Sequence, residues 1–183
     1  MSQSNGVERE LKFREVDHNQ LREQLESFEA ECTRSSALED NWIFDNQDHL
    51  LQDGKVLRLR VDRRGTRLTF KGPAKFDGKV KVRAEHQTVI EDEKQIRLIL
   101  ESLGFSVVRR YQKYREEWRL GAVIITLDHT PIGDFAEFEG DGCERVAKRC
   151  GLDPEDAERR SYLRLYEDYR KENPEAPPFM VFS

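Results

Sequence analysis

The stretch Val7-Glu8-Arg9-Glu10-Leu11-Lys12-Phe13 carries a charged residue at every second position. Successive side chains of a β-strand point to opposite faces, so Glu8, Glu10 and Lys12 share one face if this stretch is a strand. The segment Phe135-Ala136-Glu137-Phe138-Glu139 repeats the arrangement, with its two glutamates on one face. A half-buried strand usually has core residues on one face and a solvated edge on the other. The pattern therefore indicates either charged faces in water or a polar interior that holds an ionic ligand.

Length and composition limit the possible classes. A chain of 183 residues fits one domain with a proper core. Its 31 Lys and Arg and 36 Asp and Glu give a net charge of −5, which predicts no general affinity for nucleic acid or for membranes. No apolar run approaches the roughly 20 residues of a membrane span, and residues 1–6 lack the features of a secretory signal. We expect a cytoplasmic protein.

The three cysteines predict no disulfide. Cys143 and Cys150 are seven positions apart on a predicted helix, so they lie about 10 Å apart, beyond the reach of a disulfide. Their spacing is also not that of metal ligands. We expect small buried thiols in a reducing compartment.

Hydrophobic periodicity and turn residues predict about eight strands and four helices. Leu21, Leu25 and Phe28 have the spacing of an amphipathic helix, and Asp153-Pro154 resembles a helix start. Gly-containing turns such as Asp53-Gly54 separate the strands as in an antiparallel meander. The predicted strands are 7–14, 37–45, 55–62, 66–72, 79–91, 106–119, 122–128 and 134–140, and the predicted helices are 19–32, 92–103, 142–150 and 153–171. The tail 174–183, with several prolines, is predicted not to be helical, and it either packs on the body or contacts a partner.

The middle strands place cations on one face. Arg58 and Arg60 alternate with Leu57 and Leu59, and the later predicted strands continue the pattern. An open sheet with one face in water would also produce this alternation. Against it, Arg and Lys cluster in the middle strands while paired Glu residues occupy the first and last, and eight strands can close around a small ligand. The charges of a closed lumen of this kind are balanced by a polyanion that carries divalent metal ions. Arg and Lys bind the phosphates of such a ligand, and carboxylates bind its hard metal cations.

The ordered set of charged motifs resembles the CYTH superfamily, also called triphosphate tunnel metalloenzymes. The motifs, in chain order, are Glu8-x-Glu10-x-Lys12, Arg58-x-Arg60, Lys71, Arg83-x-Glu85, Lys113-x-Arg115, Asp128 and Glu137-x-Glu139. Each spacing is weak alone, but the ordered set is specific. The resemblance implies an α+β fold, a closed eight-stranded antiparallel β-barrel (tunnel) with flanking helices. It covers a single CYTH-like domain, residues 1–173, followed by the tail 174–183.

The resemblance also implies the roles of the site residues. It assigns Mg²⁺ or Mn²⁺ to the carboxylates of Glu8, Glu10, Asp128, Glu137 and Glu139. It assigns the substrate phosphates to Lys12, Arg58, Arg60, Lys71, Arg83, Lys113 and Arg115. Among these residues we expect direct catalytic roles for Glu10, Lys12, Lys113 and Arg115. The chain departs from the pattern at Gln87, where relatives often have a further glutamate. Lys81 could add a cation, Lys79 is expected on the surface, and Tyr162 is expected in the core.

We expect metal-dependent hydrolysis of a small triphosphate substrate: tripolyphosphate, thiamine triphosphate or a nucleoside triphosphate. A class IV adenylyl cyclase, which forms cyclic AMP and pyrophosphate from ATP, is the nearest alternative and uses the same motifs. A polyphosphate-binding module without turnover is a third reading. An RNA 5′-triphosphatase is disfavoured because the sequence has no basic stripe for a nucleic acid strand. The resemblance also leaves a homodimer open.

Overall fold

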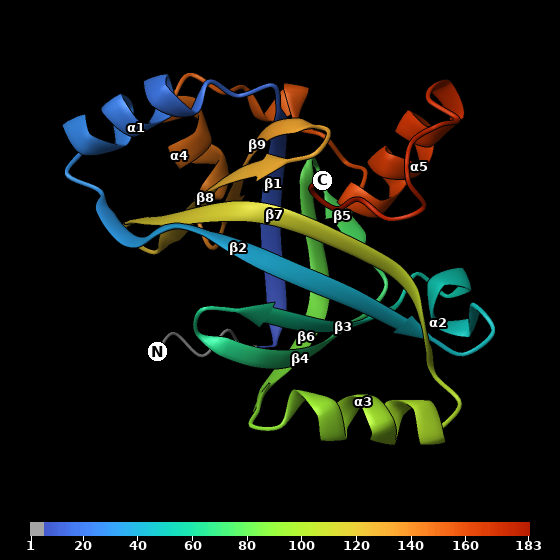
Figure 1. Cartoon of the computed structure of the whole chain (residues 1–183). Helices are drawn as coiled ribbons and strands as arrows, with labels where there is room; N and C mark the ends of the chain where they lie inside the picture. The colour runs from blue at the N-terminus through green and yellow to red at the C-terminus, as the bar shows by residue number, and fades with distance from the viewer. Residues whose placement is uncertain (1–5) are drawn as a thin grey trace.

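The computed structural model describes residues 6–183, which form nine strands and five α-helices (Figure 1). The strands are β1 (Val7–Arg14), β2 (Glu31–Asp45), β3 (Val56–Asp62), β4 (Gly65–Lys71), β5 (Lys75–Asp77), β6 (Val80–Ile90), β7 (Ser106–Leu120), β8 (Val123–Thr130) and β9 (Gly133–Glu139). The helices are α1 (His18–Ser27), α2 (His49–Gln52), α3 (Glu93–Ser102), α4 (Cys143–Arg149) and α5 (Tyr162–Glu172), with a short 3₁₀ helix at Pro154–Asp156. The expectation about a secretory signal concerns residues 1–6, of which 1–5 lie outside the described part. No helix within residues 6–183 is long and apolar enough to span a membrane.

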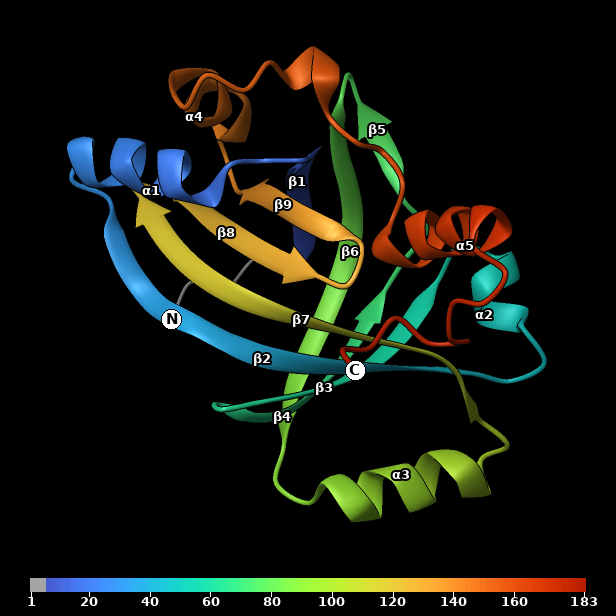
Figure 2. The ribbon, with the colours of Figure 1, turned by 45° about the horizontal axis from the view of Figure 1, so that its top comes forward.

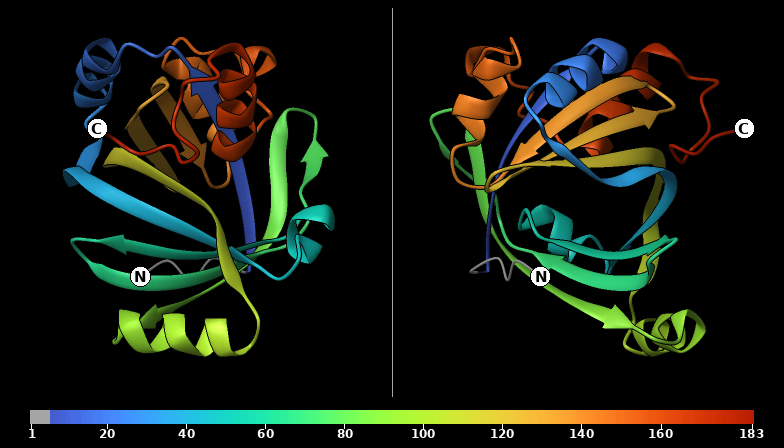
Figure 3. Two further views of the ribbon diagram at one scale, coloured as in Figure 1. Left: turned by 45° about the vertical axis from the view of Figure 1, so that its right-hand side comes forward. Right: turned by 90° about the vertical axis from the view of Figure 1, so that its left-hand side faces the viewer.

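Eight strands close into an antiparallel barrel, which confirms the predicted fold. The strand order is β1-β9-β8-β7-β2-β3-β4-β6, and β6 pairs with β1 to complete the ring. The closing pair aligns Glu8 with Arg83 and Glu10 with Lys81. The short strand β5 was not predicted; it adds to the outer edge of β6, next to the turn at Gly78. Figure 3 shows the barrel from two further sides.

Helices cover the outer, apolar face of the barrel. Leu11 and Phe13 of β1 belong to a buried cluster with Leu21 and Leu25 of α1 and with residues of α4. A second cluster lies under α3, where Leu100 packs with residues of β2 and β3. Figures 1 and 3 both place α3 on the side of the barrel opposite to α1 and α4. With their apolar faces covered outside, most strands of the barrel direct a charged face inward.

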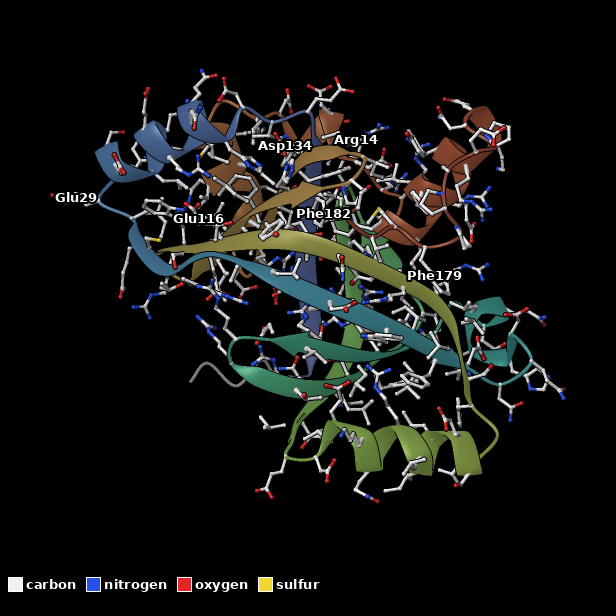
Figure 4. The ribbon with its side chains drawn as sticks, viewed as in Figure 1. Arg14, Glu29, Glu116, Asp134, Phe179 and Phe182 are labelled. Atoms are coloured by element: carbon white, nitrogen blue, oxygen red, sulfur yellow. The ribbon has the colours of Figure 1, made fainter. Side chains whose placement is uncertain are left out.

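The first helix is shorter than predicted. We expected a helix over 19–32, but α1 ends at Ser27 and the strand β2 already begins at Glu31. Glu29 adopts a left-handed backbone with φ of 58°, and the Ala30 amide donates to the Leu25 carbonyl at 2.9 Å (Figure 4). This hydrogen bond closes the helix end. Pairing of β2 with β7 then outweighs the helical periodicity, because it gives the backbone a partner strand along its length.

The last predicted helix, 153–171, is also wrong at its start. Asp153 caps only the 3₁₀ helix Pro154–Asp156, and α5 begins after Ser161, whose side chain accepts from the Arg164 amide. Between them the Glu158 amide donates to the Lys12 carbonyl at 2.7 Å. This long-range hydrogen bond ties the intervening loop to β1 and brings the start of α5 over one end of the barrel.

The tail packs back onto the body. Met180 is 1% exposed, and its amide and carbonyl bond to the backbone of β7 at Arg110 and Gln112. Phe182 lies against Tyr114 on the outer side of β7, with ring centroids 5.0 Å apart (Figure 4).

The described structure contains no disulfide. Cys143 and Cys150 are free and buried, as predicted, whereas Cys32 is free and exposed, contrary to the expectation of buried thiols. Cys32 lies at the start of β2, where Glu31 is exposed as well, whereas the later part of this strand is buried.

Candidate active site

The barrel encloses a cavity of about 330 Å³ that is lined by the alternating charged positions of its strands. Glu8, Glu10 and Lys12 of β1 point into it, while Leu11 and Phe13 point outward. Among residues 6–183, eight lysines and arginines and six glutamates line this cavity, which we call the lumen. They are Lys12, Arg58, Arg60, Lys71, Lys81, Arg83, Lys113, Arg115, Glu8, Glu10, Glu85, Glu117, Glu137 and Glu139.

The lumen brings together most of the residues predicted from the sequence. All seven predicted phosphate ligands line it: Lys12, Arg58, Arg60, Lys71, Arg83, Lys113 and Arg115. Four of the five predicted metal ligands line it as well: Glu8, Glu10, Glu137 and Glu139. The alternation of charged and apolar residues along these strands was therefore enough to predict which side chains face the lumen.

Asp128 is the predicted metal ligand that does not line the lumen. It is fully buried in the wall, where it accepts hydrogen bonds from Lys113 at 3.0 Å, from Arg115 at 2.6 and 2.5 Å and from the Tyr162 hydroxyl at 2.8 Å. These four hydrogen bonds use both carboxylate oxygens. Asp128 therefore anchors the two cations from behind.

Carboxylates gather on the wall formed by β1, β6 and β9. Glu10 and Glu139 occupy directly opposed positions of β1 and β9, a placement that is unfavourable for like charges. Burial and the neighbouring charge of Glu8 raise the pKa of Glu139 to about 7. Burial disfavours ionisation of Glu8 too, but Lys71 and Arg83 outweigh it and lower its pKa to about 2. Within residues 6–183, the Glu139 side chain has no ion pair.

The glutamates of this acidic wall have the donor chemistry for a hard divalent cation, which prefers carboxylate oxygens. A cation there would relieve the repulsion that raises the Glu139 pKa. The described residues contain no preformed group of three or more potential metal ligands. Two of the glutamates are engaged in ion pairs, since Lys71 binds Glu8 at 2.6 Å and Lys81 pairs with Glu10.

The opposite wall carries cations that are held by buried acids. Arg115 also pairs with Glu137, and burial together with Arg115 lowers the pKa of Lys113. Glu39 of β2, which the sequence analysis missed, is fully buried 3.4 Å from Arg60, 3.9 Å from Lys113 and 4.0 Å from Arg115. The polar alternation of Glu39 and Asn41 on β2 was the signal that could have identified it.

Two residues that the sequence left uncertain have definite places. Lys81 faces the lumen, whereas Lys79 binds Glu155 at the surface as expected. Tyr162 is buried as expected, but it also lines the lumen, with Lys12 Nζ 4.4 Å from its ring centroid. Further lining residues that were not predicted are Ile43, Val56, Tyr111, Ile124, Thr126, Ser161 and Leu163.

Comparisons with known proteins agree with this architecture. A Methanocaldococcus jannaschii protein provisionally named an adenylate cyclase is 29% identical over 134 residues, which are 73% of this chain and 76% of that protein. The crystal structure of a Vibrio parahaemolyticus protein with the same provisional name is 27% identical and has a TM-score of 0.79, covering 90% of this chain and 99% of that one.

A more distant structure shares the fold. It is that of HpAC1 from Hippeastrum, described as a provisionally named adenylyl cyclase with a dominant triphosphatase activity. It is 17% identical with a TM-score of 0.63, over 88% of this chain and 96% of that one. The CYTH domain matches residues 6–162, which is most of the chain. The closed barrel, its charged lumen and this match together show that the chain belongs to the CYTH domain family.

Proposed function

We propose that this protein is a divalent-metal-dependent triphosphatase whose substrate binds in the lumen. The observation that carries the proposal is the presence of both charges in one closed cavity, where six glutamates, five of them on β1, β6 and β9, lie among eight lysines and arginines. A triphosphate with a bound divalent cation matches both sets of charges at once, because its phosphates suit the lysines and arginines and its metal suits the carboxylates. Inorganic cations alone would match only the carboxylates, and anions alone would match only the lysines and arginines.

The phosphates would bind to Lys12, Arg58, Arg60, Lys71, Arg83, Lys113 and Arg115. In the described structure Arg58 Nε and Thr126 Oγ1 are buried without a hydrogen-bond partner, so each has capacity for a ligand. Lys71, Lys81 and Arg83 are paired with lumen glutamates. We propose that these pairs exchange when substrate binds, so that the cations hold phosphate oxygens and the glutamates become free.

The freed carboxylates of Glu8 and Glu10, together with Glu137 and Glu139, would hold Mg²⁺ or Mn²⁺. The metal would supply charge stabilisation at phosphate oxygens. Asp128 is not part of this set, because its oxygens are occupied in the wall.

For catalysis we assign Glu10 to the orientation of the attacking water and Lys12, Lys113 and Arg115 to the neutralisation of the phosphates. Water oxygen would bond to the terminal phosphorus while the bond to the bridging oxygen breaks. Asp128 keeps Lys113 and Arg115 in place before the reaction, so no reorganisation of these cations is needed. The triphosphatase activity described for HpAC1 supports the capacity of this fold for such chemistry.

The provisional names of the two relatives favour a second candidate, an adenylyl cyclase. It would use the same lumen, but the ribose 3′ oxygen would attack the α-phosphorus and pyrophosphate would leave. The two candidates therefore differ in products rather than in the residues that bind phosphate.

The test incubates the purified protein with Mg²⁺ or Mn²⁺ and, separately, tripolyphosphate, thiamine triphosphate and ATP. Release of phosphate supports the triphosphatase. Cyclic AMP and pyrophosphate from ATP would replace it with the cyclase, and no product from any substrate would favour a binding module.

Glu10→Gln tests the role of the acidic wall. We expect this change to lower the metal-dependent rate by about 10²- to 10⁴-fold, the usual contribution of a positioned acid or base, while the fold remains intact. Glu155→Gln is the matched control, because Glu155 is 75% exposed and lies outside the lumen. Loss of folding in Glu10→Gln would instead indicate a structural role for its pair with Lys81.

A further inference from the structure

A second cavity lies outside the lumen, at the end of the barrel covered by α5. Its volume is about 520 Å³, within the usual range for small-molecule sites. Figures 1 and 2 both show β5, α2 and α5 on this side of the molecule, and residues of all three line the cavity. Five residues line both cavities: Val56, Lys81, Arg83, Ser161 and Leu163. The second cavity is therefore a continuation of the lumen through the barrel mouth.

A stack of planar groups forms one side of this second cavity. Phe76 of β5 is 41% exposed, and the Arg159 guanidinium lies 4.2 Å from its ring centroid. Arg159 is fixed in turn by a hydrogen bond of 3.3 Å to the Gly78 carbonyl. Arginine and phenylalanine both stack on flat aromatic ligands, so this pair offers a planar surface beside the mouth.

The remaining lining combines apolar groups with an excess of positive charge. Leu51, Val56 and Leu163 supply the apolar area. Among the described residues that line the second cavity, six are cationic and two are acidic: Lys55, Lys81, Arg83, Arg109, Arg159, Arg164, Asp48 and Glu167. Glu167 is held by Arg109 at 3.2 Å and by Arg164 at 3.3 Å. A cationic organic group is disfavoured here, whereas an uncharged planar ring is compatible with both the charge and the stacking surface.

We propose that this second cavity binds the organic group of the triphosphate substrate and selects an uncharged planar base, that is, a nucleoside triphosphate. The proposal rests on the proposed binding of triphosphate in the lumen. Inorganic tripolyphosphate has no group to fill the second cavity. Thiamine triphosphate would bring a cationic thiazolium ring toward its excess of lysine and arginine.

The test compares ATP with tripolyphosphate in the wild-type protein, in Phe76→Ala and in Phe76→Trp. We expect Phe76→Ala to raise KM for ATP by at least about fivefold, the lower end of the stacking of a base on an aromatic side chain, and to leave KM for tripolyphosphate unchanged. Phe76→Trp keeps an aromatic surface and should retain the wild-type KM for ATP. Leu103→Ala is the matched control, because Leu103 is 64% exposed and lies outside both cavities.

Equal changes for both substrates in Phe76→Ala, or no change for ATP, would overturn the assignment even if hydrolysis is observed. Calorimetric binding of β,γ-methylene ATP to wild type and Phe76→Ala needs no turnover. If Phe76→Ala weakens binding of this analogue by at least about fivefold in a protein that hydrolyses none of the substrates, the proposed base site is supported while the proposed triphosphatase fails. If the analogue binds both proteins equally, the proposed base site is refuted.

Discussion

Replacing Asp128 with asparagine separates its two possible roles, metal ligand and anchor of the cationic wall. Asp128 is fully buried and accepts four hydrogen bonds, three of them from the cations Lys113 and Arg115. Asparagine has the same shape but no charge, and it turns an NH₂ group toward one of these donors. Breaking one partner of a buried ion pair costs about 3–5 kcal/mol. For a chain of this size that loss lowers the Tm by about 6–20 °C.

The measurement is unfolding in guanidinium chloride followed by tryptophan fluorescence, together with calorimetric binding of Mn²⁺ to the folded variant. Asp134→Asn is the matched control, because the Asp134 side chain is 44% exposed and binds His129 at 2.7 Å. We expect this control to change the free energy of unfolding by less than about 0.5 kcal/mol. If Asp128→Asn keeps the wild-type stability but loses Mn²⁺ affinity, then Asp128 is a metal ligand and the anchoring role is wrong.

Three further predictions concern the acidic wall, the tail and the thiols. The pKa of Glu139 is raised to about 7, so between about pH 4.5 and 7 the folded metal-free protein holds a proton that the unfolded chain releases. The free energy of unfolding of the metal-free protein should therefore fall by about 3 kcal/mol as pH rises through this window. Glu139→Gln should remove this pH dependence, and an unchanged pH dependence in the variant would contradict the raised pKa of Glu139. Met180→Ala should cost about 2–5 kcal/mol in thermal unfolding, because Met180 is 1% exposed, and a loss below about 1 kcal/mol would show that the tail does not pack as described. A thiol reagent should modify Cys32 alone in the native protein, and rapid reaction of all three cysteines would contradict the burial of the other two.

The strand pattern of the sequence predicted most of the fold. Eight predicted strands correspond to the eight strands of the closed barrel, and the inward direction of Glu8, Glu10 and Lys12 follows from alternation alone. The short strand β5 and the short helix α2 were not predicted, and the other errors fall at segment ends, where α1 stops at Ser27 and α5 starts at Tyr162. Local periodicity could not locate these ends, because the competing interactions come from β7 and from β1, far away in the chain.

The resemblance to the CYTH superfamily predicted the residue types of the site but not their partners. Eleven of the twelve predicted charged residues line the lumen, and Asp128 lies behind its wall. Glu39 was missed because the alternating polar positions Glu39 and Asn41 of β2 are not among the motifs that carry the resemblance.

The sequence by itself determined which side chains face the interior, because the two-residue period of a strand is a local property. Only the tertiary structure decided which of them meet. Closure of β1 on β6 and β9 brings Glu10 opposite Glu139, and the return of the chain after α4 brings Tyr162 to Asp128. These contacts join residues far apart in sequence, and their energies depend on burial and on the charges of several strands at once, which no local pattern encodes.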